Sequence, residues 1–257
     1  MTRLALLLLL GAAQPAVAQD ACAPIPAVFP FAPPSEPLRF VIETDRPVST
    51  GGTRRFGLEY RMQFHAVGRG HGLTATLLHI HAPDAMAAGN AMAAIFEPLV
   101  GRPVEFVYDA NAGRLLLRKD VADALWKLLA DETVTRAEKA EPGEARSVAA
   151  MLLDLPVGQR ESTLFGDFGQ MLSFAGQSPG SDLMASIPAV DGDCRLVRLT
   201  GRSGGTHGGP GFQTDTLWLV DVQTGLVHEQ REEVTQVLEA SEKPVLAART
   251  VRRLIPE

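Results

Sequence analysis

The sequence predicts an α+β fold in which an antiparallel sheet carries its helices on one face. Strand-like alternation occurs in two regions of the chain, helical spacing occurs between them, and 257 residues suffice for a sizeable core. With 46% hydrophobic and 21% charged residues, the composition disfavours a disordered or a membrane protein. The formal net charge of −6 argues against a nucleic-acid partner.

The first 18 residues have the pattern of a removable export signal. Arg3 supplies a positive charge, a short leucine-rich run follows, and small residues lead up to Ala18. The run is too short to span a bilayer, which disfavours the alternative, a membrane anchor. We therefore expect cleavage between Ala18 and Gln19, a periplasmic or secreted protein, and no transmembrane segment in the mature chain.

The mature chain contains two cysteines, Cys22 and Cys194. An oxidising compartment favours a disulfide between them, although two unrelated thiols remain the alternative. The bridge would close a loop of nearly the whole chain, which is worth about 4–5 kcal/mol in the chain-entropy model. It would hold a proline-rich, extended arm (residues 19–37) against a single α+β domain (residues 38–257).

The amino-terminal strands are expected to form a hairpin. Apolar and polar residues alternate through residues 55–64, glycines in residues 68–72 provide the turn, and residues 73–82 form the returning strand. A second hairpin is expected further along, with strands at residues 104–108 and 114–118.

Helical patterns and the remaining strands follow from spacing and capping signals. Asp84 and Asp120 each precede apolar residues at helical spacing, as an N-cap would. The helices are expected at residues 84–101, from Asp120 onward, at 144–155 and at 159–175. The last helix would carry an apolar stripe of Leu164, Phe168 and Met171, with Phe165 and Leu172 beside it. The final strands are expected at residues 194–200, 214–222, 226–237 and 245–254.

The chain contains one internal similarity. Residues 104–113 and 216–225 each show a strand that ends in aspartate, three turn residues, and a glycine that suits a left-handed conformation. A duplicated half-domain would produce this pattern, and so would two ordinary hairpins.

The segment from Gly176 to Gly180 matches the G-x-S-x-G pattern of serine hydrolases around Ser178. The residue after the nucleophile must donate its backbone N–H to the oxyanion, but Pro179 has none. The segment also follows a helical pattern instead of a strand. We therefore interpret it as a turn.

Two glycine-rich segments, residues 68–72 and 201–211, lie between expected strands. A phosphate-binding loop of the Walker type needs a lysine and a following helix, and neither segment provides them. Both are interpreted as hairpin loops, the longer one with a possible role as a lid.

His79 and His81 are the best candidates for metal ligands, because residues two apart on a strand share a face. Folding the hairpin about Gly70 predicts that Glu59 lies opposite His81 and that Arg61 lies opposite His79. A cationic Arg61 would oppose a metal ion, so we favour two histidines on a polar face and predict no metal site. Further ligands could come from His65, His71, His207 or His228, and Glu59 could add a carboxylate.

Methionines and phenylalanines are concentrated on the expected helices. Such side chains can line an adaptable apolar site, or they can fill the core beneath the sheet. These residues are Met86, Met92, Met151, Met171, Phe96, Phe165, Phe168 and Phe174.

Residues 217–227 combine an aromatic-bearing strand, an Asp-x-x-Thr-Gly turn and a second strand. With the export signal and the strand meanders, this pattern resembles the exported bacterial half-barrel proteins of the lipoprotein-carrier type. The resemblance implies a curved, half-barrel-like antiparallel sheet and an apolar cavity between sheet and helices. It assigns no individual binding residue.

The leading hypothesis is non-catalytic binding of a lipid-like or other apolar small molecule, with no cofactor and no catalytic residue. The alternative is a structural or interaction module of the cell envelope that lacks a ligand cavity, and a metal-dependent hydrolase is a third. The sequence does not identify protein partners.

Overall fold

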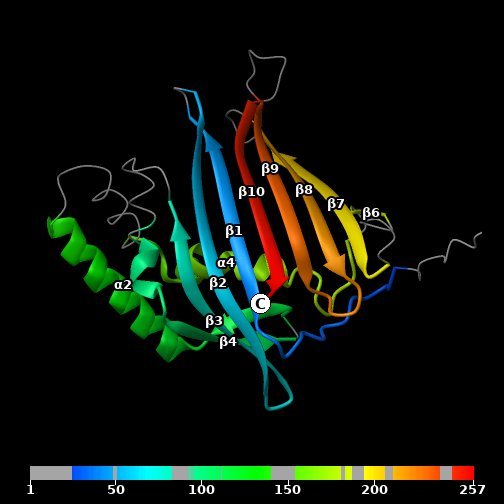
Figure 1. Cartoon of the computed structure of the whole chain (residues 1–257), viewed down its shortest axis with the longest axis horizontal. Coiled ribbons are helices and arrows are strands. Elements are labelled where there is room, and N and C mark those ends of the chain that lie inside the picture. The colour runs from blue at the N-terminus through cyan, green and yellow to red at the C-terminus, as the bar shows by residue number, and fades with distance from the viewer. Residues whose placement is uncertain are drawn as a thin grey trace, which may run out of the picture.

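A computed structural model of the chain describes residues 25–48, 51–82, 93, 95–110, 112–139, 154–180, 183–186, 194–205, 211–237 and 245–257. They form one ten-stranded antiparallel sheet and two α-helices, α2 (Lys119–Lys139) and α4 (Val157–Met171) (Figure 1). The strand order is β5-β4-β3-β2-β1-β10-β9-β8-β7-β6, so the sheet is open. The fold is dominated by this sheet, in agreement with the expected antiparallel class.

The first half of the chain contributes β1 (Leu38–Pro47), β2 (Thr53–Val67), β3 (Gly70–His81), the short helix η1 (Glu97–Leu99), β4 (Pro103–Asp109) and β5 (Arg114–Leu117). The second half contributes β6 (Met184–Ser186), β7 (Leu196–Gly205), β8 (Gly211–Asp221), β9 (Val227–Val237) and β10 (Val245–Pro256). The strands expected in residues 194–254 are confirmed, and β7 and β8 extend into the glycine-rich segment.

The first and last strands meet in the middle of the sheet. β1 pairs with β2 on one side and with β10 on the other, so Leu38 lies between Met62 and Pro256 (Figure 1). The sequence reasoning did not assign β1, although Leu38, Phe40 and Ile42 alternate as buried residues with period two. This missed strand joins the two halves into one sheet.

Helix α4 packs against one face of the sheet. The centre of the Phe168 ring lies 4.9 Å from the ring centre of Tyr60, 5.9 Å from that of Phe40 and 5.5 Å from that of Phe106. This one side chain therefore packs against β1, β2 and β4. The expected apolar stripe is confirmed as buried, and Leu129 of α2 belongs to the same core. The helix ends at Met171, four residues before the predicted end at Ala175, because the chain then enters a series of turns.

The proline-rich arm contributes to a second core. Residues 25–37 form no strand, as expected, but Phe29 is fully buried instead of lying on the surface. Its ring lies 5.9 Å from Phe174, and its N–H donates a hydrogen bond to the Gln177 carbonyl at 2.9 Å. The arm is therefore part of the packed domain.

The two similar hairpin turns have the same local construction. Asp109 Oδ1 accepts a hydrogen bond from the Ala112 N–H, and Asp221 Oδ1 accepts one from the Gln223 N–H. Gly113 and Gly225 both have φ near +60° to +73°, which favours glycine. One turn joins β4 to β5 at the sheet edge, whereas the other joins β8 to β9 inside the sheet. These non-equivalent positions favour two ordinary hairpins over duplication.

Several predicted features lie outside the described residues. These are the signal segment with its Ala18–Gln19 cleavage site, Cys22, most of the helix expected at 84–101, and nearly all of the helix expected at 144–155. Among the helices that the structure describes, none combines the length and hydrophobicity needed to span a bilayer.

Candidate functional site

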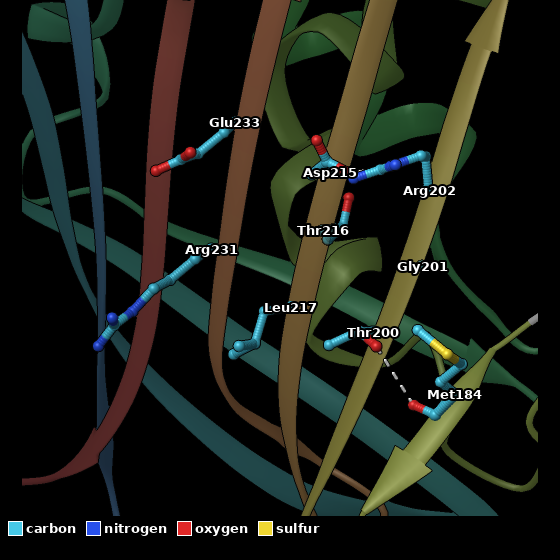
Figure 2. A pocket seen from close by; sticks show the side chains of 9 residues that line it. All are labelled: Met184, Thr200, Gly201, Arg202, Asp215, Thr216, Leu217, Arg231 and Glu233. Atoms are coloured by element: carbon cyan, nitrogen blue, oxygen red, sulfur yellow. Dashed lines mark hydrogen bonds and ion pairs between the residues drawn. The ribbon is translucent and has the colours of Figure 1, made fainter.

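The described surface carries a groove of about 670 Å³ over β6, β7, β8 and β9 (Figure 2). Leu217 and Thr200 form its floor, because these residues pair across β7 and β8. Met184 of β6 lies at one side, 75% exposed, and its carbonyl accepts a weak 3.5 Å hydrogen bond from Thr200 Oγ1. We call this depression the β6–β9 groove.

Charged side chains border the β6–β9 groove, and each has an opposite partner. Arg202 Nε lies 2.5 Å from Asp215 Oδ1, and Gln213 donates to the other oxygen of Asp215 at 2.8 Å. The hydrogen bonds from Arg202 and Gln213 hold the pKa of Asp215 below its ordinary value. On the opposite border, Glu233 pairs with Arg249 at 2.7 Å. The groove therefore has an apolar floor and a charge-balanced rim.

The β6–β9 groove lies on the face of the sheet opposite α4. On the α4 side, Arg252 binds Asp167 of the helix at 2.6 Å, and Gln230 donates to Gln170 of the helix. Register places Trp218 beside Gln230, so Leu217, the next residue of β8, points the other way. Figure 2 shows the groove side chains in front of the strands and helical ribbon behind them.

The face that carries the groove is elsewhere covered by ion pairs between neighbouring strands. Arg253 lies 2.8 Å from Glu43 and 3.4 Å from Glu229, and Arg55 lies 2.8 Å from Asp45. Such exposed pairs contribute about 0–1 kcal/mol each and keep the surface polar. The floor of the groove is therefore an apolar patch on a face that is otherwise covered by ion pairs.

The histidine pair takes a different register from the one predicted. Glu59 lies opposite His79 instead of His81, because the hairpin turns at residues 68–69 instead of at Gly70. A β-bulge at Glu59 and Tyr60, with one extra residue in β3, then shifts the register back by one residue. Arg61 lies opposite Thr76 and binds Glu257 at 2.8 Å. Both histidines are exposed, which agrees with the polar-face interpretation.

Glu59 is the centre of a charge cluster at the bulge. Its carboxylate binds Arg39 and lies 3.6 Å from His81 Nε2. Burial would raise the pKa of Glu59, but the hydrogen bond and charge of Arg39, together with His81, lower it overall. Within the described ranges, no three histidine, cysteine, aspartate or glutamate side chains are placed to hold a metal ion.

The aromatic residues beneath α4 leave almost no free space. The void bounded by Tyr60, Phe165 and Phe168 measures about 10 Å³, close to the volume that one water molecule requires. Around these three side chains, the helix residues fill the core. Met86, Met92 and Met151 lie outside the described residues.

A second titratable cluster surrounds the turn between β8 and β9. The fully buried Asp221 lies 2.6 Å from Arg195 Nη2 and 3.6 Å from His228 Nε2. Burial would raise the pKa of Asp221, but hydrogen bonds from His228, Arg195 and the Gln223 N–H outweigh it and leave the pKa well below its ordinary value. The cluster organises a turn, since Gln223 and Thr224 donate to the same carboxylate.

The remaining candidate residues have structural positions. Ser178 is exposed in the chain that follows α4, and Gly176 has φ +68°, which confirms a turn instead of a strand-to-helix elbow. Cys194 is exposed in the turn before β7, and its pairing with Cys22 stays a prediction.

Sequence reasoning missed the residues of the β6–β9 groove. The sequence predicts the strand that contains Leu217, but the place of Leu217 beside Thr200 depends on strand register. Met184 belongs to a strand of three residues that has no signal of its own. Comparison with protein-family models and with curated proteins finds no match to this chain.

Proposed function

We propose that this chain is an exported, non-catalytic protein that binds a lipid-like or other apolar small molecule in the β6–β9 groove. The observation that carries the proposal is the apolar surface of Leu217 on the floor and Met184 at the side of the groove, within an otherwise ion-paired face. A volume of about 670 Å³ falls within the range of small-molecule sites. In this proposal the sheet is half-barrel-like, as the resemblance to lipoprotein carriers implies, but the ligand lies on the face opposite α4 and not between sheet and helices.

Binding would be driven by the removal of apolar surface from water, which contributes about 25 cal/mol per Å². The rim would impose little desolvation cost, because Arg202 and Glu233 already have ionic partners. No nucleophile and general base face each other among the residues that line the groove. The chemistry of the groove therefore favours binding over catalysis.

The alternative is a structural or interaction module of the envelope without a small-molecule ligand. The nearly filled interface between α4 and the sheet favours this second candidate, because a carrier with its site there would need space. The two candidates differ in whether apolar molecules occupy the groove.

The first test is native mass spectrometry of the protein purified from an exporting host, followed by solvent extraction of bound molecules. Titration with a dansyl-labelled fatty acid then compares the wild type with Leu217→Gln and Leu219→Gln. Both leucines point away from α4 on β8, but only Leu217 lines the groove.

Loss of the buried leucine surface should weaken binding of the labelled fatty acid about tenfold or more in Leu217→Gln, since burial of a leucine is worth about 1.5–3 kcal/mol. Leu219→Gln should bind as the wild type does. Equal binding by both variants, or no binding by the wild type, would refute the groove as the ligand site.

A further inference from the structure

A row of neighbouring residues crosses the β6–β9 groove from one side to the other. Antiparallel register places Met184 of β6 beside Thr200 of β7. Thr200 in turn lies beside Leu217 of β8, and Leu217 lies beside Arg231 of β9. Figure 2 shows these side chains in the same order across the four strands. Three strand spacings separate the two ends of the row, which corresponds to about 14 Å.

The two ends of this row differ in chemistry. At the β6 end, Met184 is 75% exposed and presents an uncharged thioether side chain. At the β9 end, Arg231 presents a positive charge, with 59% of its side chain exposed. The Arg231 side chain extends from β9 across β10, away from Leu217 (Figure 2). An elongated molecule in the groove would therefore meet an apolar end and a cationic end.

The guanidinium of Arg231 retains hydrogen-bond donors for a ligand. The hydrogen bond that it makes within the described part of the chain runs from Nε to Glu229 Oε1. A guanidinium has five N–H donors in a planar fork, so those on the two terminal nitrogens remain. Such a fork can bind two oxygens of a carboxylate or a phosphate at once.

The ionic partner of Arg231 has a second arginine. Arg253 Nε lies 3.4 Å from Oε2 of Glu229, the carboxylate oxygen that Arg231 leaves unoccupied. The Glu229 side chain is only 17% exposed, and loss of every cation beside it would be costly. Because Arg253 remains, Arg231 can turn toward an anionic ligand without leaving this carboxylate unpaired.

The two acidic side chains that line the groove are held by other arginines. Asp215 accepts a hydrogen bond from Arg202, and Glu233 accepts one from Arg249 at 2.8 Å. These carboxylates therefore do not occupy the terminal nitrogens of Arg231. A cationic head group would have to displace Arg202 or Arg249, whereas an anionic one can use donors that are already present. The charges of the groove therefore favour an anion.

We propose that the ligand of the β6–β9 groove is a single-chain amphiphile with an anionic head group, a carboxylate or a phosphate, which binds Arg231 while its alkyl chain points toward Met184. This inference rests on the proposed function and adds the class of ligand and its orientation. The alkyl chain gains affinity by covering Leu217. The ion pair is exposed, so its contribution is modest and decreases as salt is added.

The test is displacement, from the full mature protein, of a fatty acid that carries a dansyl label at the end of its alkyl chain. Dodecanoate and dodecyl phosphate supply the two anionic head groups, dodecanol is the neutral analogue, and dodecylamine is the cationic analogue. We expect the preferred anion to bind about fivefold more tightly than dodecanol, and dodecylamine to bind more weakly. This preference should disappear in about 1 M NaCl, where the Debye length is about 3 Å. The ranking of dodecanoate and dodecyl phosphate identifies the head group.

The outcomes separate this inference from the proposed function. If the labelled fatty acid does not bind the wild type, or binds Leu217→Gln equally well, the groove is not the ligand site and both proposals fail. If dodecanol or dodecylamine displaces the label as well as both anions do, the groove binds apolar molecules but the anionic head group is refuted.

A matched pair of variants tests Arg231 itself. Arg231→Gln removes the guanidinium at the end of the row, whereas Arg61→Gln removes one of similar exposure, 51%, from β2, where it pairs with Glu257 outside the groove. Affinity for the preferred anion should fall about fivefold in Arg231→Gln and stay unchanged in Arg61→Gln, and dodecanol should bind both alike. Arg231→Lys should retain part of the preference, because it keeps the charge without the planar fork. No loss in Arg231→Gln, or an equal loss in both glutamine variants, would refute Arg231 as the head-group ligand.

Discussion

Replacement of Phe168 by alanine tests whether the aromatic cluster beneath α4 is a packed core or part of a ligand site. Phe168 is 1% exposed, and its ring lies within 6 Å of Phe40, Tyr60, Phe106 and Phe165. The surrounding void is about 10 Å³, so neighbouring side chains have little slack with which to refill the space. Truncation of a buried phenylalanine costs about 3–5 kcal/mol under these conditions.

The assay is urea unfolding followed by circular dichroism. A loss of this size should lower the unfolding midpoint by about 1–2 M with an unchanged slope. The matched control is Phe212→Ala, because Phe212 is 48% exposed and its removal should change stability by less than about 0.5 kcal/mol. A loss below about 1 kcal/mol in Phe168→Ala, together with altered fatty-acid binding, would refute the packed-core reasoning and relocate the ligand beneath α4.

Two further predictions concern the turn before β9 and the cysteines. Asp221→Asn should lower stability by about 1–3 kcal/mol at neutral pH, because the variant loses its ion pair with Arg195. The pKa of Asp221 is lower in the folded protein than in the unfolded chain, where it is near 4. The carboxylate therefore stabilises the fold fully above about pH 4, and this stabilisation is lost as the pH falls toward the pKa of the folded state. The difference between the unfolding free energies of the wild type and Asp221→Asn, measured in urea, should therefore narrow below about pH 4. A difference that does not change with pH would contradict this assignment. The intact mass of the mature protein should lie two hydrogens below the reduced value if Cys22 and Cys194 pair, and alkylation of both thiols without reductant would exclude the bridge.

The strand and helix pattern was largely predictable because it depends on local periodicity. The stripe of Leu164, Phe168 and Met171 is buried as predicted, since helical spacing alone selects that face. β1 was predictable in principle from Leu38, Phe40 and Ile42. The pairing of β1 with β10 was not predictable, because it joins residues that are more than 200 positions apart.

The candidate site depended on features that sequence does not reveal. The turn at residues 68–69 and a β-bulge at Glu59 and Tyr60 together decide which residue faces His79, and no pattern in residues 55–82 marks the position of the bulge. The groove likewise needs the registers of two strand pairs, β6–β7 and β7–β8, before Leu217, Thr200 and Met184 become neighbours. Residue types predict the face of a strand, but neighbours across strands follow from register.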